Sequence, residues 1–227
     1  MKAKILIIAT LVFLVSNLFA QQSEERNVGS FDEIRVSQAI TVYLSPGNTE
    51  SLKVEARGID LDNVLTEVSG SRLKIHLKNG NYNNSSVKVY VTFKELSEIT
   101  ASSASGVFSD GLIKGDDLKI SASSAADIEV DVEVSYLEVS ASSSGDVEVT
   151  GKTNNLDISV SSAGDVDAYD LNAKEVKVRA SSAGGAKVNA LEKIDARASS
   201  GGSIRYKGNP SHSQTDSSSK SSVRKSN

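Results

Sequence analysis

The sequence contains no cysteine and no tryptophan, and aromatic residues make up only 5% of its 227 positions. Without cysteine, no disulfide can stabilise the chain, and no lipid anchor can form on a cysteine that follows an export signal. The scarcity of large rings fits a core of Val, Ile, Leu and Ala stacked in rows better than a globular sandwich. Apolar residues at helical spacing are also lacking, so we expect an all-β fold.

Histidine and positive charge are scarce as well. The chain has 25 Lys and Arg against 29 Asp and Glu, a net charge of −4, which disfavours nucleic-acid binding. Its two histidines, His76 and His212, lie outside the serine-rich repeats, so no repeated serine has a nearby base that would make it a nucleophile. We therefore expect no catalytic residues and a protein that is not an enzyme.

One short sequence motif, here also called the phrase, occurs six times in the second half of the chain. Each copy has two serines followed by two small residues, and the first serines lie 21, 19, 19, 20 and 18 residues apart. These first serines are Ser102, Ser123, Ser142, Ser161, Ser181 and Ser199. A period near 19 residues is too short for a two-helix repeat and predicts a parallel β-helix, or β-solenoid, whose rungs are about 19 residues long.

Each repeat divides into two strands that flank the phrase, here termed the serine corner. Apolar residues alternate before the corner, as at Leu137 and Val139, and after it, as at Val147 and Val149. This period of two predicts that one side of each strand is buried. We expect glycines to supply positive φ angles at the corners. These glycines are Gly145, Gly164, Gly184 and Gly201.

Domain boundaries follow from where the phrase occurs. Residues 28–95 alternate like strands but lack serine corners, so they predict an irregular β half, either a continuation of the solenoid or a packed cap. Its loop at 78–86 contains Asn79-Gly80, which could seed a hairpin. We expect this half to form one continuous body with the regular rungs at 96–210. Residues 211–227 would be a degenerate capping rung, since Ser218 lies 19 residues after Ser199, or a flexible tail.

Residues 1–20 have the pattern of a secretory signal peptide. Lys2 and Lys4 precede an apolar run at 5–15, which is shorter than the ~20 residues needed to span a bilayer. We expect cleavage after Ala20, a flexible leader at 21–27 and no stable membrane insertion afterwards. The mature chain would be exported to the periplasm, the outer surface or the surroundings of a Gram-negative-type bacterium.

Carboxylates recur at the outward positions that follow the corners. Stacking would place Asp127, Asp146 and Asp165 in one column and Glu129, Glu148 and Asp167 in the column beside it. Neighbours about 5 Å apart along the axis would repel each other. Either solvation and salt screening offset this cost, which is the simpler interpretation, or a hard cation such as calcium bridges the columns. No other cofactor is expected.

The sign of the charge also changes along the chain. Between Asp127 and Asp170 there are eleven acidic residues and one basic residue, whereas from Lys174 to Lys225 there are eleven basic and four acidic residues. An acidic middle beside a basic end would favour head-to-tail contact between copies or binding to anionic envelope polymers. A soluble surface of mixed patches is the alternative. The oligomeric state therefore stays open.

Several motifs occur in a specific order along the chain. They are Phe31-Asp-Glu-Ile34-Arg-Val36, the Leu73-Lys-Ile75 strand, Leu96-Ser-Glu-Ile99 leading into Ser-Ala-Ser-Gly, the serine-rich rungs, and Tyr206-Lys-Gly208-Asn209-Pro210. From about Val28 to the C-terminus, the chain thereby resembles the putative auto-transporter adhesin head GIN domain family. The resemblance implies an exported β-helical envelope or surface protein, and it brings no catalytic residues.

Two classes of function fit these observations. A non-catalytic, adhesin-like structural and binding module needs only export and a long solenoid face, and its partners would be envelope or host glycans or surface proteins. The alternative is a polysaccharide-binding or polysaccharide-degrading β-helix protein, which for catalysis needs a non-repeated cluster of Asp, Arg, Lys or His in a cleft. The acidic residues here follow the repeat instead, so we favour the first class. Tyr82 and Tyr90 are the candidates for a sugar platform, and the simpler interpretation is that they are packed or rim residues.

Overall fold

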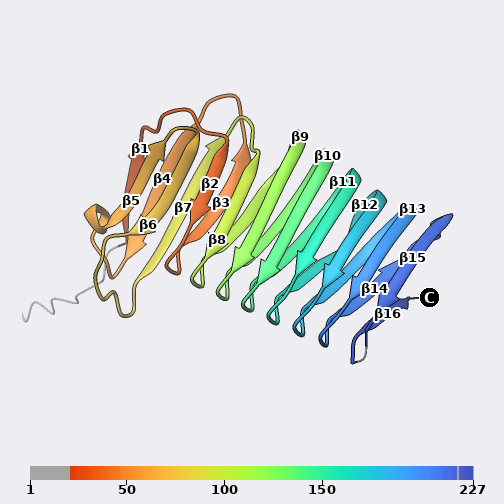
Figure 1. The fold of residues 1–227 in the computed structure, drawn as a ribbon. Helices are drawn as coiled ribbons and strands as arrows, with labels where there is room; N and C mark the ends of the chain where they lie inside the picture. The colour runs from red at the N-terminus through yellow and green to blue at the C-terminus, as the bar shows by residue number, and fades with distance from the viewer. Residues whose placement is uncertain (1–20, 219, 227) are drawn as a thin grey trace, which may run out of the picture.

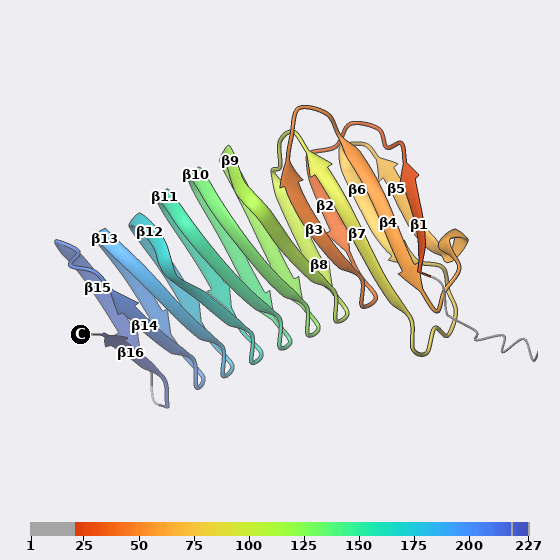
Figure 2. The same ribbon diagram turned by 180° about the vertical axis from the view of Figure 1, so that it is seen from behind.

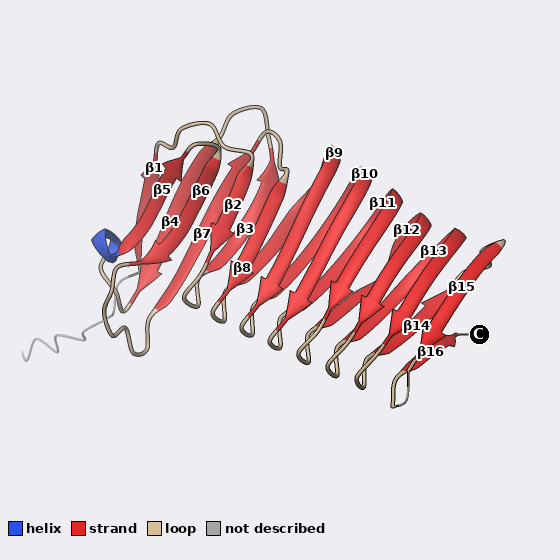
Figure 3. Cartoon of the chain, in the orientation of Figure 1, coloured by secondary structure: helices blue, strands red, loops and turns tan. Residues whose placement is uncertain are grey.

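The computed structural model describes residues 21–218 and 220–226, which form one elongated stack of strands (Figures 1 and 2). The expected signal peptide at 1–20 lies outside the described residues. Strands dominate, and a single turn of 3-10 helix, η1 (Leu61–Asn63), is the helical element of the described part (Figure 3). The strands are β1 (Gln22–Arg26), β2 (Glu33–Val36), β3 (Thr41–Pro46), β4 (Ser51–Arg57), β5 (Val64–Ser69), β6 (Arg72–Leu77), β7 (Ser86–Phe93), β8 (Glu98–Ser102), β9 (Gly106–Ser123), β10 (Asp127–Ser142), β11 (Asp146–Val160), β12 (Asp165–Ala180), β13 (Gly185–Ala198), β14 (Ser203–Lys207), β15 (His212–Ser217) and β16 (Ser222–Lys225).

The predicted parallel solenoid is confirmed in the regular half. Val139 of β10 pairs in parallel register with Ile120 of β9 and with Ile158 of β11. These three side chains and Val178 of β12 are all buried, so they form the expected internal ladder. Strands β9 to β13 each run unbroken from one corner to the next, so the two strands that we expected in each rung are segments of one continuous strand.

The corners bend differently from our prediction. The second and third corner residues, not the glycines after them, have positive φ: Ser143 and Ser144, for example, have φ angles of 52° and 58°. Gly145 follows them, and a Cβ there would lie 2.6 Å from the backbone carbonyl of Ala122 on the preceding rung. The predicted role of Gly145, Gly164 and Gly184 was therefore wrong, since these glycines permit close stacking of backbones. Gly201 alone of the four has positive φ.

Spatial order differs from chain order in the N-terminal half. The rung β2–β3 lies between the rung β6–β7 and the first serine rung β8–β9, with parallel pairing on both sides. Its corner is Gln38-Ala39, which has the same positive φ angles, and Ala39 donates a hydrogen bond to the Ser103 carbonyl at 2.9 Å. The hairpin considered at Asn79-Gly80 does not form: β6 pairs with β2 and β5, whereas β7 pairs with β3 and β4.

Antiparallel strands close the N-terminal end of the column. β4 pairs with β7 and β1 pairs with β4, and separately β5 pairs with β6 (Figure 1). The flexible leader expected at 21–27 is therefore corrected: Gln22–Arg26 form β1, whose Arg26 donates hydrogen bonds to the carbonyls of Val64 and Leu61. The N-terminal half is therefore both a continuation of the solenoid and a packed cap, the two alternatives that the sequence left open.

A degenerate rung closes the C-terminal end. β15 pairs with β13 and β16 pairs with β14, so Val223 lies next to Ile204 as the serine alignment predicts. The inward positions of β15 carry Ser213, Thr215 and Ser217 where β13 has apolar residues. Hydroxyl-bearing side chains can face water, and terminal repeats of solenoids need such a polar outer surface.

Candidate binding face

Two long faces remain exposed once the core is formed. The upstream face consists of the outward residues of the strand segments before each corner, and the downstream face consists of those after each corner. On the upstream face, charges of both signs are mixed along the stack and several of them form ion pairs. Lys119 contacts Glu138 at 3.4 Å, and Lys177 contacts Asp157 at 2.7 Å. Charges on this face are therefore largely neutralised by neighbouring rungs.

On the downstream face, aromatic, acidic and basic side chains are grouped in separate parts of the stack. One column of register partners crosses the stack from β7 and β3 through β9 to β14 and β16. In spatial order it contains Tyr90, Tyr43, Phe108, Glu129, Glu148, Asp167, Lys187, Arg205 and Arg224. We term its thirds the aromatic block (Tyr90, Tyr43, Phe108), the acidic block (Glu129, Glu148, Asp167) and the basic block (Lys187, Arg205, Arg224).

The aromatic block is a stack of three rings. The ring centroids of Tyr43 and Tyr90 lie 5.3 Å apart at an interplanar angle of 17°, and those of Tyr43 and Phe108 lie 5.9 Å apart. Lys53 lies over the Tyr90 ring and Lys88 over the Tyr43 ring. Tyr90 is exposed, and Tyr43 and Phe108 are half-buried, so the block presents apolar rings and polar hydroxyls together, a combination common at interfaces.

The acidic residues lie in the two columns that the sequence predicts. Asp127, Asp146 and Asp165 are register partners beside the acidic block. Partial burial raises the pKa of the Asp127 carboxyl, and the charge of Asp146 raises it further. The described residues contain no group of three or more His, Asp or Glu side chains that could hold a metal ion. Calcium binding by these columns stays a prediction.

The boundary between acidic and basic blocks is an ion pair. The Lys187 ammonium donates to Asp167 Oδ2 at 2.7 Å, which raises the pKa of Lys187. Lys187 also lies over the ring of Tyr169, where Lys207 lies 5.4 Å from the centroid. Within the described residues, Glu129, Glu148, Arg205 and Arg224 form no ion pair. This face therefore carries charges that the fold itself leaves uncompensated.

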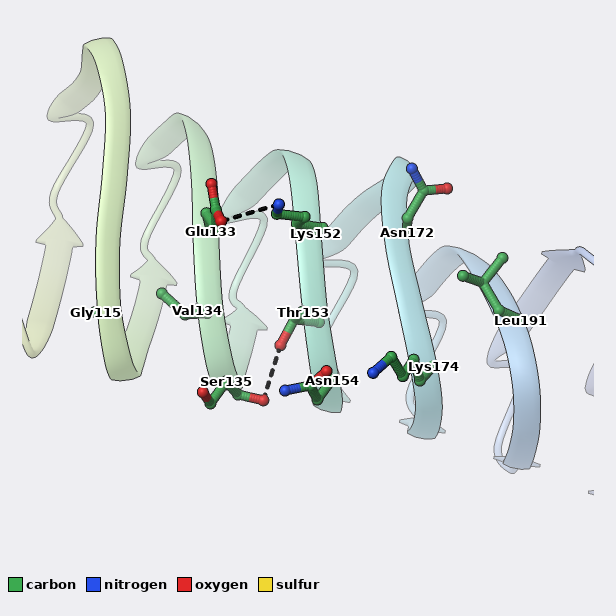
Figure 4. A pocket seen from close by; sticks show the side chains of 10 residues that line it. All are labelled: Gly115, Glu133, Val134, Ser135, Lys152, Thr153, Asn154, Asn172, Lys174 and Leu191. Carbon is green, nitrogen blue, oxygen red and sulfur yellow. Dashed lines mark hydrogen bonds and ion pairs between the residues drawn. The ribbon is translucent and has the colours of Figure 1, made fainter.

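A shallow hollow of about 560 Å³ lies along the edge opposite the corners, where β10 to β13 bend (Figure 4). Glu133 supplies its one carboxylate, and Lys152 contacts it at 2.9 Å. A hydrogen bond from Lys152 lowers the pKa of Glu133. A glycosidase general acid needs a raised pKa and a second carboxylate across the scissile bond, so these residues do not fit that chemistry.

Sequence reasoning found part of this face. It named Tyr90 but paired it with Tyr82, which packs against the core from the loop after β6. It missed Tyr43 and Phe108, the actual ring partners of the block. Aligning Ile40-Thr-Val-Tyr43 with Ser105-Gly-Val-Phe108 would have placed the two rings at equivalent positions after a corner.

A flat-sided β-solenoid capped at both ends, with two open faces, is the class of protein that these observations define. The family described as "Putative auto-transporter adhesin, head GIN domain" matches residues 30–210. The chain belongs to this family, as its motif order predicted. A comparison with curated proteins gives no match.

Solved structures share the fold at low sequence identity. A structure described as a putative adhesin from Bacteroides fragilis has a TM-score of 0.84 and 19% identity, and the match covers 91% of this chain and 97% of that one. A putative adhesin from Parabacteroides merdae gives 0.76 and 20%, covering 91% and 96%. A structure from Parabacteroides distasonis described as a putative lipid binding protein gives 0.69 and 24%, covering 91% and 97%. Within the described part of the chain, no helix is long and apolar enough to cross a membrane.

Proposed function

We propose that the chain is an exported, non-catalytic, adhesin-like module that binds surface glycans through its downstream face. The separation of side chains on that face carries the proposal. The upstream face mixes charges of both signs and pairs several of them, as expected for a solvated surface, whereas the downstream face gathers three rings in one place. Exposed tyrosine rings beside lysine and carboxylate groups are a common composition of binding surfaces.

The aromatic block is the proposed contact point for the glycan. Tyr90 is 38% exposed, its hydroxyl lies 3.4 Å from Glu55 Oε2, and the Lys53 ammonium lies 5.7 Å from its ring centroid. An exposed tyrosine ring offers apolar contact to a sugar, and the hydroxyl, ammonium and carboxylate beside it offer hydrogen bonds. The regular face around them allows an extended polymer to lie across several rungs.

A non-catalytic role fits the chemistry of the exposed groups. The one carboxylate of the hollow in Figure 4 is held by Lys152. The repeated serines have no histidine among their corner neighbours in the sequence. Incubation of the mature chain with envelope and host glycans should release no reducing ends, and release that one point substitution abolishes would reverse this part of the proposal.

A binding array tests the glycan contact. The mature chain should bind at least one envelope or host glycan, and the Tyr90→Ala variant should lose most of that binding. The Tyr136→Ala variant is a matched control, because Tyr136 is also 38% exposed but lies on the upstream face. Equal loss in both variants, or binding to surface proteins but to no glycan, would contradict the proposed contact.

A further inference from the structure

We propose that two copies of the chain pack through their downstream faces, with the acidic block of each copy against the basic block of the other. The two-fold axis would run parallel to the strands, between β12 and β13. This inference goes beyond the proposed function, because it concerns the acidic and basic blocks and leaves the aromatic block of each copy free.

The first observation is the uncompensated charge of this face. Glu129, Glu148, Arg205 and Arg224 are exposed, and within the described residues none of them has an ion-pair partner. On the upstream face of the same rungs, Lys177 pairs with Asp157 and Lys193 pairs with Glu175. The upstream face therefore pairs several of its charges across rungs, whereas on the downstream face only Asp167 and Lys187 of the six charged block residues do so within the described residues.

The second observation is the symmetry of the two blocks. Three acidic residues occupy three consecutive rungs, three basic residues occupy the next three, and the boundary lies between Asp167 and Lys187. Rotation about an axis along the strands at this boundary reverses the direction of the solenoid. It brings Glu129 opposite Arg224 of the second copy, Glu148 opposite its Arg205, and Asp167 opposite its Lys187. Because both copies have the same rung spacing of about 4.8 Å, all pairs stay in register.

The neighbouring column is complementary under the same rotation. Its register partners are Asp127, Asp146, Asp165, Gly185, Ser203 and Ser222. Asp127 would lie opposite Ser222 and Asp146 opposite Ser203, so that two carboxylates of each copy gain hydroxyl donors. Asp165 would lie opposite Gly185, and the Asp165 carboxylate of each copy already lies over the Gly185 of its own chain. A hydrogen bond to a charged acceptor is stronger than a bond between neutral groups.

Other arrangements of two copies are less favourable. An axis along the solenoid would place acidic block on acidic block, and like charges at an interface repel. The upstream face has charges of both signs mixed along the stack, and several of them are paired within the chain, so charge there favours neither orientation of a second copy. Charge complementarity therefore favours packing through the downstream faces about an axis parallel to the strands.

The size of the contact predicts a weak, salt-sensitive dimer. Six rungs at about 4.8 Å and three outward positions at about 7 Å give a contact on the order of 600 Å² per copy, at the low end for specific interfaces. Most of the pairs are charged, and exposed charges are screened at high ionic strength. We therefore expect dimers at low salt and monomers at high salt.

Sedimentation velocity on the full mature chain tests the dimer. At about 20 mM salt and a concentration series, the wild-type chain should form dimers that dissociate at about 0.5 M salt. Two charge-reversed variants, Glu129→Lys/Glu148→Lys and Arg205→Glu/Arg224→Glu, should each be monomeric. An equimolar mixture of the two should dimerise again, since every reversed charge then faces its opposite.

Two controls make the result specific. The Lys177→Glu/Lys193→Glu variant changes net charge by the same amount as Arg205→Glu/Arg224→Glu but on the upstream face, and it should dimerise like wild type. The Tyr90→Ala variant should also dimerise, which separates this inference from the glycan proposal. Circular dichroism melting checks that each variant is folded. A monomeric wild type at low salt, a mixture that fails to associate, or equal loss in the upstream variant would overturn the proposal.

Discussion

Asp167 and Lys187 are register partners on adjacent strands, and their side chains form an ion pair of 2.7 Å where the sign of the downstream face changes. The other two residues of the acidic block lie on the Asp167 side of this pair, and the two arginines of the basic block lie on the Lys187 side. An exposed pair of this kind contributes little to stability, on the order of 0.2–1 kcal/mol. Its position as the boundary between two blocks is therefore of more interest than its energy.

The buried ladder gives the first prediction. Val139→Asp should lower the free energy of unfolding by several kcal/mol, because Val139 is buried between Ile120 and Ile158 and nothing there compensates a charge. Ser159→Asp is the control, since Ser159 faces outward beside Arg179 and should change stability by less than about 0.5 kcal/mol. Denaturant unfolding measures both, and equal effects would mean that the assigned register is wrong.

The corners give a second prediction. Gly164→Ala should destabilise the chain by about 1–3 kcal/mol, because the added Cβ would lie 2.8 Å from the carbonyl of Ala141. Ser162→Gly should be neutral or stabilising, because Ser162 has a φ of 52°, a region that glycine occupies without strain. Chemical denaturation of the two variants decides the matter. The opposite order of stabilities would restore the role of corner glycines that the sequence predicted.

These two predictions show how much the sequence could foresee. The period of 19 residues fixes which residues stack, so the ladder of Val139 and the columns of Asp127, Asp146 and Asp165 were predicted and are confirmed. The corner at Gln38-Ala39 was missed, because Gln38 replaces the second serine and only Ser37 remains of the serine pair. Local sequence also cannot reveal that β2–β3 is inserted between two rungs that come later in the chain.

The pH dependence of stability gives a third prediction. Because the pKa of Asp127 is raised above its ordinary 3.8, the folded state holds the proton to a higher pH than the unfolded state. Stability from this group therefore falls as pH rises through 3.8 and the folded pKa, and the loss is complete at neutral pH. Asp127→Asn should raise the melting temperature at pH 7 and have little effect below about pH 3.5. A variant that is equally stabilised at both pH values would show that ionisation of Asp127 is not the cause.

Calcium provides a fourth prediction, directed at the acidic columns. If these carboxylates are only solvated, calcium chloride and sodium chloride at equal ionic strength should raise the melting temperature alike by screening. Asp146→Asn should then stabilise the chain slightly and leave the salt response unchanged. A calcium-specific rise that this substitution abolishes would instead identify a metal site. A calcium-specific rise that survives it would place the ligands elsewhere.

Adhesion through the aromatic block is the central claim, and a bead assay measures it most directly. Beads carrying equal amounts of wild type, Tyr43→Ala/Tyr90→Ala or Tyr136→Ala are applied to bacterial envelope preparations and to host cell surfaces. The account predicts that wild type and Tyr136→Ala beads adhere to at least one surface, and that the double variant falls to the level of albumin-coated beads. Adhesion of the double variant equal to that of wild type would contradict the account, as would no adhesion by any of them.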